Sequence, residues 1–347
     1  MALTTLPTAA LADGAVTTEK LVADVNFRNI IINGDMSIAQ RSTSVASISS
    51  VGYYTIDRFK LTDASSGTWT QSQSTDVPTG QGFATSLKMD CTTADASPGS
   101  GDSLVLQQLI EGQNLQYLKK GTSSAESTTL SFWVKSNKTG TYICELRDID
   151  NNRTISQSYT ISSANTWEKK TITFAGDTVE AFLNDNTAGL NLAFSLGSGT
   201  DYTTTDATSW GSFSSGKLAY GQVANIASST ANNFYITGVQ LEAGTTASDF
   251  EFLPVDVNLN RCHRYCNAFM DYGAGNVSGN RCYSSGYGAS GGFVRMSIPR
   301  MRTQPTLTYV ASGGTIDTDY GAPDIIQLLD NDDNTFYIYD VIAEAEL

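Results

Sequence analysis

From Asn29 onward, hydrophobic and polar residues alternate along the chain with a period of two. Leu130, Phe132 and Val134 alternate with polar positions and Trp133, and the run LNLAFSL at 190–196 repeats the pattern. Turn sequences separate these runs, among them SNKTG at 136–140, DIDNN at 148–152 and GSGTD at 197–201. Short alternating runs joined by turns predict an all-β fold, an antiparallel jelly-roll sandwich.

The pattern also divides the chain into three parts. Residues 1–27 carry only a short Leu21/Val25 stripe with a capping threonine, which predicts an N-terminal docking or shaft segment. Residues 28–254 form the predicted jelly roll, in which 104–118 is interpreted as a strand followed by a short helical connection. The alternation stops at Pro254 and resumes in a Gly-, Ser- and Tyr-rich style, so 255–347 is predicted to be a smaller β-rich C-terminal tip domain.

Composition and charge exclude several classes of partner. Only 16% of the 347 residues are charged, and 35 acidic against 21 basic residues give a net charge of -14. An acidic surface repels phosphate backbones and anionic lipid, so neither nucleic acid nor a membrane surface is expected as a partner. No run of 18 apolar residues occurs, so no membrane insertion is expected. The first 16 residues have no basic region before an apolar stretch, which argues against an export signal.

The sequence offers little for catalysis. His263 is the only histidine, no G-x-S-x-G motif is present, and His263 and Cys262 are adjacent, so their side chains diverge. Residue types that bind zinc are present at Cys262, His263, Cys266 and Cys282. Their spacing is not that of a zinc finger, so buried thiols are favoured. We therefore expect no catalytic residue, no metal ligand and no enzyme activity. A glycoside-cleaving carboxylate pair is the enzyme alternative, although most acidic residues, such as Asp148 and Asp150, lie in turns, where solvated carboxylates are the default.

Neither acidic turn has the pattern of an EF-hand. DIDNNRT at 148–154 has Arg153 where an EF-hand requires glycine, and DNDDN at 330–334 is interpreted as a polar hairpin turn. No cofactor is expected, although the sequence leaves a structural calcium ion open.

Aromatic residues suggest a binding surface for sugars. Such surfaces stack aromatic rings on C–H faces and add hydrogen bonds from polar side chains. Trp210 lies in the polar loop DYTTTDATSWGSF with Tyr202 nearby, and both are candidate ligand-binding residues. Tyr283 and Tyr287, in the segment CYSSGYGASGG at 282–292, are two further candidates. Trp133 and Trp167 are expected to pack in the core or on a sheet face instead.

Several segments together resemble one family of proteins. They are NIIINGDMSIAQRSTS (29–44), YTIDRFKL (54–61), LSFWVKSNKTGTY (130–142), NTWEKKTITFAGDT (165–178), FYITGVQLEAGTTASDFEFLPV (234–255) and RCHRYC (261–266). In this combination and order they resemble bacteriophage tail-fibre and related virion structural proteins, especially of marine phages. LADGAVTTEKL at 11–21 resembles one shaft repeat of such fibres, and MRTQPTLTY at 301–309 resembles their C-terminal part.

The resemblance implies a carbohydrate-binding-module-like jelly roll with a β-rich tip, made in the host cytoplasm and assembled into the virion as a homotrimer. Its implied partners are other tail or capsid proteins and a glycan of the host-cell surface, and jelly rolls of this kind often carry a structural calcium ion. Whether the chain contacts the host or joins other fibre parts stays open. The alternatives are an exported monomeric carbohydrate-binding or adhesion module and a polysaccharide depolymerase.

Overall fold

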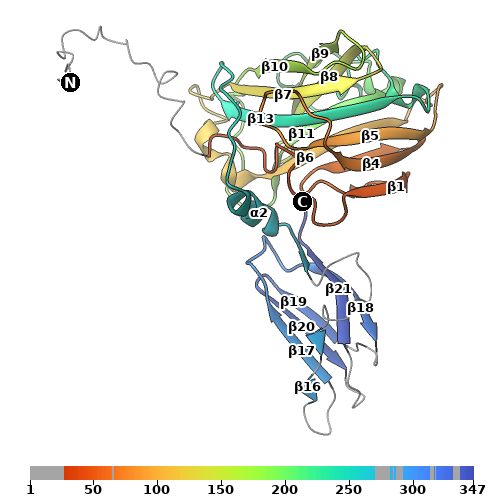
Figure 1. Cartoon of the computed structure of the whole chain (residues 1–347). Helices are drawn as coiled ribbons and strands as arrows, with labels where there is room; N and C mark the ends of the chain where they lie inside the picture. The colour runs from red at the N-terminus through yellow and green to blue at the C-terminus, as the bar shows by residue number, and fades with distance from the viewer. Residues whose placement is uncertain are drawn as a thin grey trace, which may run out of the picture.

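The computed structural model describes residues 27–64, 66–269, 282–283, 285–286, 292–312, 316, 318–330 and 337–347. Two antiparallel sheets pack face to face in the larger part of the molecule, and a smaller pair of sheets lies beyond a short helix (Figure 1). The prediction of an all-β antiparallel sandwich is confirmed by this sheet topology. The N-terminal segment predicted at 1–27 lies outside the described residues except for Phe27.

The first sheet of the sandwich, sheet A, has six strands. In spatial order they are β1 (Ser44–Ile48), β4 (Thr68–Ser74), β5 (Ser86–Thr93), β13 (Asn233–Ala243), β7 (Thr128–Ser136) and β10 (Glu168–Phe174). The second, sheet B, has seven. They are β12 (Gly211–Ser212), β9 (Arg153–Ile161), β8 (Gly140–Asp148), β11 (Ala188–Ser198), β6 (Ser103–Glu111), β3 (Lys60–Ala64) and β2 (Gly52–Tyr53).

The hydrophobic phase of each strand fills the space between the two sheets. Leu130, Phe132 and Val134 of β7 are fully buried, as the alternation predicts, and Phe132 meets Phe194 of β11 edge to face at 5.1 Å. The segment 104–118 is a strand, β6, followed by two 3-10 turns, η3 (Gly112–Asn114) and η4 (Gln116–Leu118). The predicted strand and short helical connection are therefore confirmed.

A long connection covers the outer face of sheet B. It follows β11 and contains three 3-10 turns, η5 (Thr200–Tyr202), η6 (Ser215–Lys217) and η7 (Ile226–Ser228), together with β12. The Ser156 amide of β9 donates to Ala207 O at 2.7 Å, and the Ser156 hydroxyl donates to Lys217 O at 2.9 Å. As a result, Ala193 and Ser195 on the outward side of β11 are each only 4% exposed.

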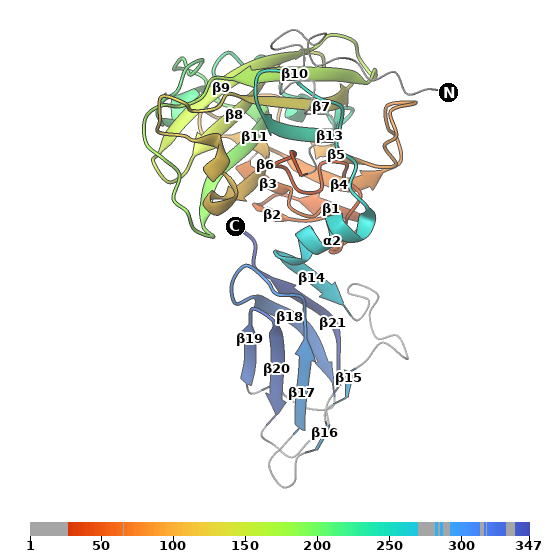
Figure 2. The same cartoon turned by 90° about the vertical axis from the view of Figure 1, so that its left-hand side faces the viewer.

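Helix α2 (Val255–His263) leads from the sandwich to the C-terminal strands (Figure 2). These form two four-stranded sheets over a separate hydrophobic cluster that includes Val294, Leu328 and Val341. One sheet contains β14 (Cys266–Phe269), β21 (Tyr337–Glu344), β15 (Cys282–Tyr283) and β18 (Thr306–Ser312); the other contains β16 (Ser285–Gly286), β17 (Gly292–Ser297), β20 (Ile325–Asp330) and β19 (Thr318–Ala322).

Charged pairs fix the C-terminal sheets against the sandwich. Arg58 of the sandwich donates to the carboxylate of Glu346, and its guanidinium lies 3.4 Å from the centre of the Tyr265 ring. Arg41 contacts Glu344 at 2.6 Å and Glu346 at 3.0 Å. Both arginine side chains are buried, and such charge-assisted contacts are strong and directional. The junction between the two parts is therefore specifically packed.

Candidate functional site

The outer face of sheet A carries a groove with a tryptophan in its lining. Because residues of a strand alternate between its two faces, Trp133 and Ser131 point outward while Phe132 points into the core. Trp133 lies opposite Lys169 of β10 and Thr237 of β13. The groove has a volume of about 370 Å³. It is lined by Gly80, Gln81, Phe83, Ser131, Trp133, Lys169, Gly238, Asp249, Phe250 and Phe252.

Three phenylalanines form one wall of this groove. The ring centroids of Phe83, Phe250 and Phe252 lie 4.9–5.1 Å apart from one another, at tilted or edge-to-face angles. Gly238 leaves room for the Phe83 ring, because a Cβ atom at this position would lie 2.5 Å from Cζ of Phe83. The φ of Gly238, +62°, is left-handed and also favours glycine. Phe252 remains 50% exposed, so the wall presents an apolar surface to solvent.

The segment after β13 supplies Asp249, Phe250 and Phe252 to the groove. Gly244 O accepts a 2.8 Å hydrogen bond from the Thr129 hydroxyl, and the Gln240 side chain donates to Ser248 Oγ at 3.0 Å. The Gln240 side-chain oxygen accepts from the Glu251 amide at 2.8 Å. These bonds hold residues 244–252 against the sheet and so place Asp249 and the phenylalanines at the groove.

Aromatic and charged side chains continue along the same outer face. Lys135 lies two residues after Trp133, and its ammonium nitrogen is 4.4 Å from the centre of the Tyr235 ring. Lys88, opposite Tyr235 on β5, approaches the same ring at 5.4 Å. Trp167 packs against Tyr235 at 6.1 Å. The face therefore combines half-buried aromatic rings with three lysines, including Lys169, on a chain of net charge -14.

Asp76 orders the end of this aromatic strip. Its carboxylate accepts a 3.0 Å hydrogen bond from Trp167 Nε1 and pairs with Lys135. Burial disfavours its ionised form, but the hydrogen bonds from Lys135 and Trp167 outweigh that effect and lower the pKa of Asp76. Asp76 therefore stays ionised and holds the Trp167 ring in a defined orientation.

The structure does not bring Trp210 and Tyr202 into one site. Trp210 is half-buried against the main core, donates from Nε1 to Ala175 O at 2.6 Å, and lines a cavity of about 20 Å³. Tyr202 donates to Gly101 O at 3.1 Å and lines a different cavity of about 20 Å³ under the cover of sheet B. Neither cavity has room for a sugar ring.

Of the two C-terminal candidates, only Tyr283 lies within the described residues. Tyr283 is the last residue of β15 and pairs with Tyr337 of β21, whereas Tyr287 lies outside the described residues. The predicted hairpin turn at 330–334 also lies outside them apart from Asp330, which ends β20.

The cysteines near His263 are buried thiols. Burial raises the pKa of both Cys262 and Cys266, so neither is a ready nucleophile, and burial lowers the pKa of His263. Within the described ranges no group of three histidine, cysteine or acidic residues is placed to hold a metal ion. Asp148 and Asn151 of the DIDNN turn bond to each other at 2.9 Å, and Asp148 pairs with Lys120 at 2.6 Å.

The sequence predicts that Trp133 and Trp167 pack in the core or on a sheet face and assigns neither to a site. The signal for Trp133 was nevertheless present, because the run LSFWVKS puts it in the polar phase of a strand whose other phase is fully apolar. The wall formed by Phe83, Phe250 and Phe252 had no such signal, since it is assembled from segments far apart in the sequence.

Sequence comparison finds no matching family model and no matching curated protein. Among solved structures, the chain is similar to the enzymatically active domain of bacteriophage CBA120 tailspike protein 4, with 16% identity, a TM-score of 0.33, and coverage of 63% of this chain and 22% of that one. It is also similar to TmCBM61 in complex with β-1,4-galactotriose, with 13% identity, a TM-score of 0.29, and coverage of 62% and 99%.

A third similar structure is the family 11 carbohydrate-binding module from Clostridium thermocellum in complex with a mixed-linked tetrasaccharide. Its identity is 11% and its TM-score 0.26, with coverage of 59% of this chain and 98% of that module. At these TM-scores the similarities assign no function to this chain, and its fold is defined by its own sheets. Within the described residues, no helix has the length and apolar character needed to cross a membrane.

Proposed function

We propose that this chain binds glycan through the groove at Trp133, as a component of a virion fibre. The observation that carries the glycan-binding proposal is the groove itself, in which an indole, an apolar wall and polar side chains line one hollow on the outer face of sheet A. Its 370 Å³ volume lies within the range of roughly 300–1,000 Å³ common for small-molecule sites.

Each part of the groove has a role in the proposal. The C–H face of a pyranose ring stacks on Trp133, and the sugar hydroxyls exchange hydrogen bonds with Gln81, Lys169 and Asp249. The strip formed by Tyr235 and Trp167 extends the surface along β7 and β13 for further sugar units. No step requires a reacting carboxylate pair, so binding without cleavage is the proposed activity.

A matched pair of aromatic substitutions tests the groove. Binding of the wild-type chain to an array of bacterial surface polysaccharides identifies a ligand, and calorimetry then compares W133A with Y220A, which removes a 41% exposed ring from the cover of sheet B. We expect W133A to lose at least tenfold in affinity while Y220A binds as the wild type does. F252A serves as a second groove variant, because Phe252 is half exposed and its truncation leaves the core intact.

Wild-type affinity in a folded W133A and a folded F252A would exclude this groove as the binding site. Melting temperatures close to that of the wild type establish that both variants are folded. The absence of any bound polysaccharide on the array would remove glycan binding as the proposed function.

The virion setting is supported by the sequence resemblance alone. In that setting three chains associate, and three weak sites on one fibre bind a repetitive cell surface with enhanced avidity. Light scattering of the full chain is expected to give about three times 37.1 kDa, and a chain beginning at Phe27 tests whether the N-terminal segment supports assembly. A monomer in both cases would favour the exported carbohydrate-binding or adhesion module instead.

A further inference from the structure

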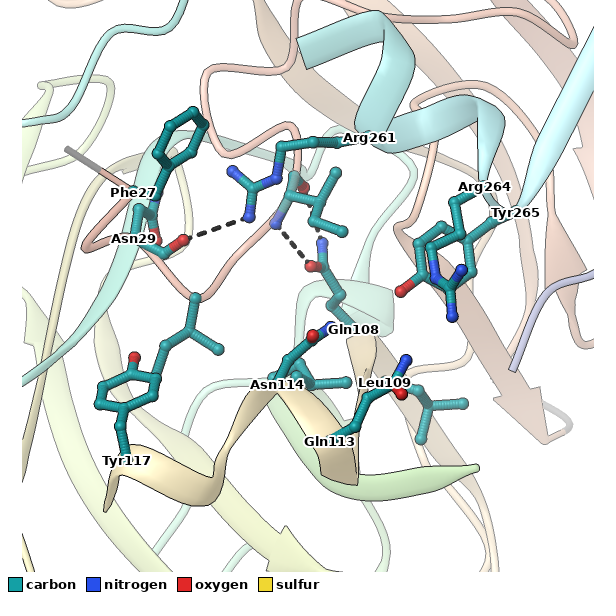
Figure 3. Close-up of a pocket in the computed structure, with 13 residues that line it drawn as sticks. Phe27, Asn29, Gln108, Leu109, Gln113, Asn114, Tyr117, Arg261, Arg264 and Tyr265 are labelled. Atoms are coloured by element: carbon teal, nitrogen blue, oxygen red, sulfur yellow. Dashed lines mark hydrogen bonds between the residues drawn. The ribbon is translucent and has the colours of Figure 1, made fainter. Parts of the chain in front are cut away.

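A second cavity lies where the rim of the sandwich meets helix α2. It has a volume of about 400 Å³, and its lining comes from three places in the sequence: the stretch 27–32, the end of β6 with turns η3 and η4, and the α2 region at 261–265. Figure 3 shows Arg261 entering the cavity from α2, with Tyr117 and Asn114 on the turns across from it. The cavity is separate from the groove at Trp133, since the two share no lining residue.

Arg261 is a half-buried cation without an acidic partner at contact distance. Within the described part of the chain, its side chain makes a single hydrogen bond, from Nη2 to Asn29 O at 3.3 Å, and no carboxylate oxygen lies within 4.0 Å of it. Burial lowers the pKa of Arg261. A guanidinium has five N–H donors in a planar fork, so most of its donors here remain available to a ligand.

The acidic residues around Arg261 are occupied by other partners. The carboxylate of Glu251 accepts from the backbone amides of Phe27 and Asn29, the latter at 3.0 Å. The carboxylate of Glu111 accepts two 2.7 Å hydrogen bonds from Arg264 and one of 2.6 Å from Tyr265. The neighbouring Arg264 is thus paired with a carboxylate in direct contact, whereas Glu251 acts on Arg261 only at longer range, so the free N–H donors of Arg261 remain available at the cavity.

The remaining lining suits a ring with polar substituents. Tyr117 is 49% exposed and Phe27 62% exposed, so each offers an aromatic surface at the cavity. The exposed Asn114 adds an amide that can both donate and accept, while Ile30 and Ile110 provide apolar contact. Gln108 is unavailable, because its side chain bonds both to the Ile32 amide at 2.8 Å and to Ile32 O at 2.9 Å.

We propose that this cavity binds a sugar that carries a carboxylate, a uronic acid unit, whose acid group pairs with Arg261 and whose ring packs against Tyr117. A planar guanidinium and a carboxylate match in geometry and form paired hydrogen bonds. An aromatic ring across the cavity from the cation selects a cyclic ligand over a small inorganic anion. The site is independent of the groove at Trp133 and does not rest on the function proposed there.

Trigalacturonic acid and its methyl ester test the proposal, because the two probes share their rings and differ in charge. We expect calorimetry of the full chain to give at least tenfold tighter binding for the acid than for the ester, with a preference that falls as salt is raised. R261Q removes the preference, while R300Q, a change at an exposed arginine outside the cavity lining, keeps it. Y117A is expected to weaken the binding of both probes by the same factor.

The proposal is overturned if the wild-type chain binds the acid and the ester equally, or binds neither. It is also overturned if folded R261Q keeps the preference, or if a tripeptide of aspartate binds as tightly as the acidic sugar, which would indicate a protein partner. Y117A keeps the site testable if R261Q does not fold, because Tyr117 is half exposed. W133A is expected to bind the acid as the wild type does, so the outcome here is distinct from the outcome at the groove.

Discussion

The carboxylate of Glu111 accepts two hydrogen bonds, each of 2.7 Å, from the guanidinium of Arg264. Glu111 ends strand β6 of the sandwich, and Arg264 directly follows helix α2. Burial disfavours the ionised carboxylate, yet the hydrogen bonds from Arg264 and Tyr265 lower the pKa of Glu111. This pair therefore ties the C-terminal part of the chain to the sandwich rim, and its Arg264 also lines the cavity at Arg261.

Replacement of Arg264 by alanine is expected to destabilise the chain by about 2 kcal/mol, because it leaves a buried carboxylate with fewer donors. Chemical denaturation measures the change. Lys119→Ala is the control, since Lys119 forms a 2.7 Å pair with Glu126 at the surface and its side chain is 54% exposed. That exposed pair is worth less than about 1 kcal/mol. Equal losses in the two variants would contradict a structural role for the Glu111–Arg264 pair.

Gly34 has a steric role within the segment NIIINGDMSIAQRSTS. A Cβ atom at Gly34 would lie 2.0 Å from Val239 O, and Gly34 O accepts from the Val239 amide at 2.9 Å. Gly34→Ala is therefore expected to cost about 3 kcal/mol, because the 29–44 segment must move away from β13. Gly221→Ala is the comparison, because no atom lies within 4 Å of the added Cβ. Alanine there must only adopt a left-handed φ of +81°, which is expected to cost about 1 kcal/mol.

Thermal melts of both variants measure this difference. A Gly34→Ala chain that melts at the same temperature as Gly221→Ala would show that the close approach to Val239 is not required. The side chain of Asn33, beside Gly34, donates to Ile38 O at 2.9 Å and to Asp57 O at 3.1 Å. Asn33 and Gly34 therefore both have a structural role in the segment 29–44.

The sequence predicted the sandwich because burial in its core follows from the alternation within single strands. For Trp133 the sequence predicted packing in the core or on a sheet face, and the structure places it on the outer face of sheet A. The groove could not be predicted, because Phe83 meets Phe250 and Phe252 only after two segments far apart in the sequence fold over sheet A. The polar loop at 201–213 suggested exposed aromatic residues. Instead, the Trp210 ring packs against the main hydrophobic core, and its N–H donates to Ala175 O.

Arg261 illustrates the same limit at the second cavity. RCHRYC drew attention to its cysteines and histidine, whereas the arginines within it contact residues distant in the sequence. Arg264 meets Glu111, and Arg261 meets Asn29. Nothing local in the sequence distinguishes the arginine that pairs with a carboxylate from the one that has no carboxylate in contact.

Glu145 is expected to make stability depend on pH. The residue is 2% exposed, and burial raises the pKa of its carboxyl group from 4.5 to about 7 against the opposing effects of the Thr154 hydroxyl and Arg147. A group whose pKa is higher in the folded chain binds more protons there, so stability falls as pH rises between those two values. The loss contributed by Glu145 is about 3 kcal/mol.

Glu145→Gln is expected to remove this loss, so that the variant gains stability relative to the wild type between about pH 4.5 and pH 7 and keeps the gain above it. Asp57, whose pKa burial raises to about 6, titrates in the same window in both chains. The difference between the two denaturation curves therefore isolates Glu145. A difference that does not change with pH would show that Glu145 is not buried as an acid under the cover of sheet B.

Substitutions at Trp210 and Trp133 are expected to have different effects, the first on stability and the second on glycan binding. Trp210→Ala removes a half-buried ring that packs against the main core and a 2.6 Å hydrogen bond to Ala175 O, so it is expected to cost about 2 kcal/mol. Because Trp210 lines no part of the groove, glycan affinity measured under native conditions is expected to stay unchanged. Trp133→Ala is expected to do the reverse, with a small change in melting temperature and a large loss of affinity. If Trp210→Ala abolished binding while the chain stayed folded, the glycan site would instead belong to the loop at 201–213.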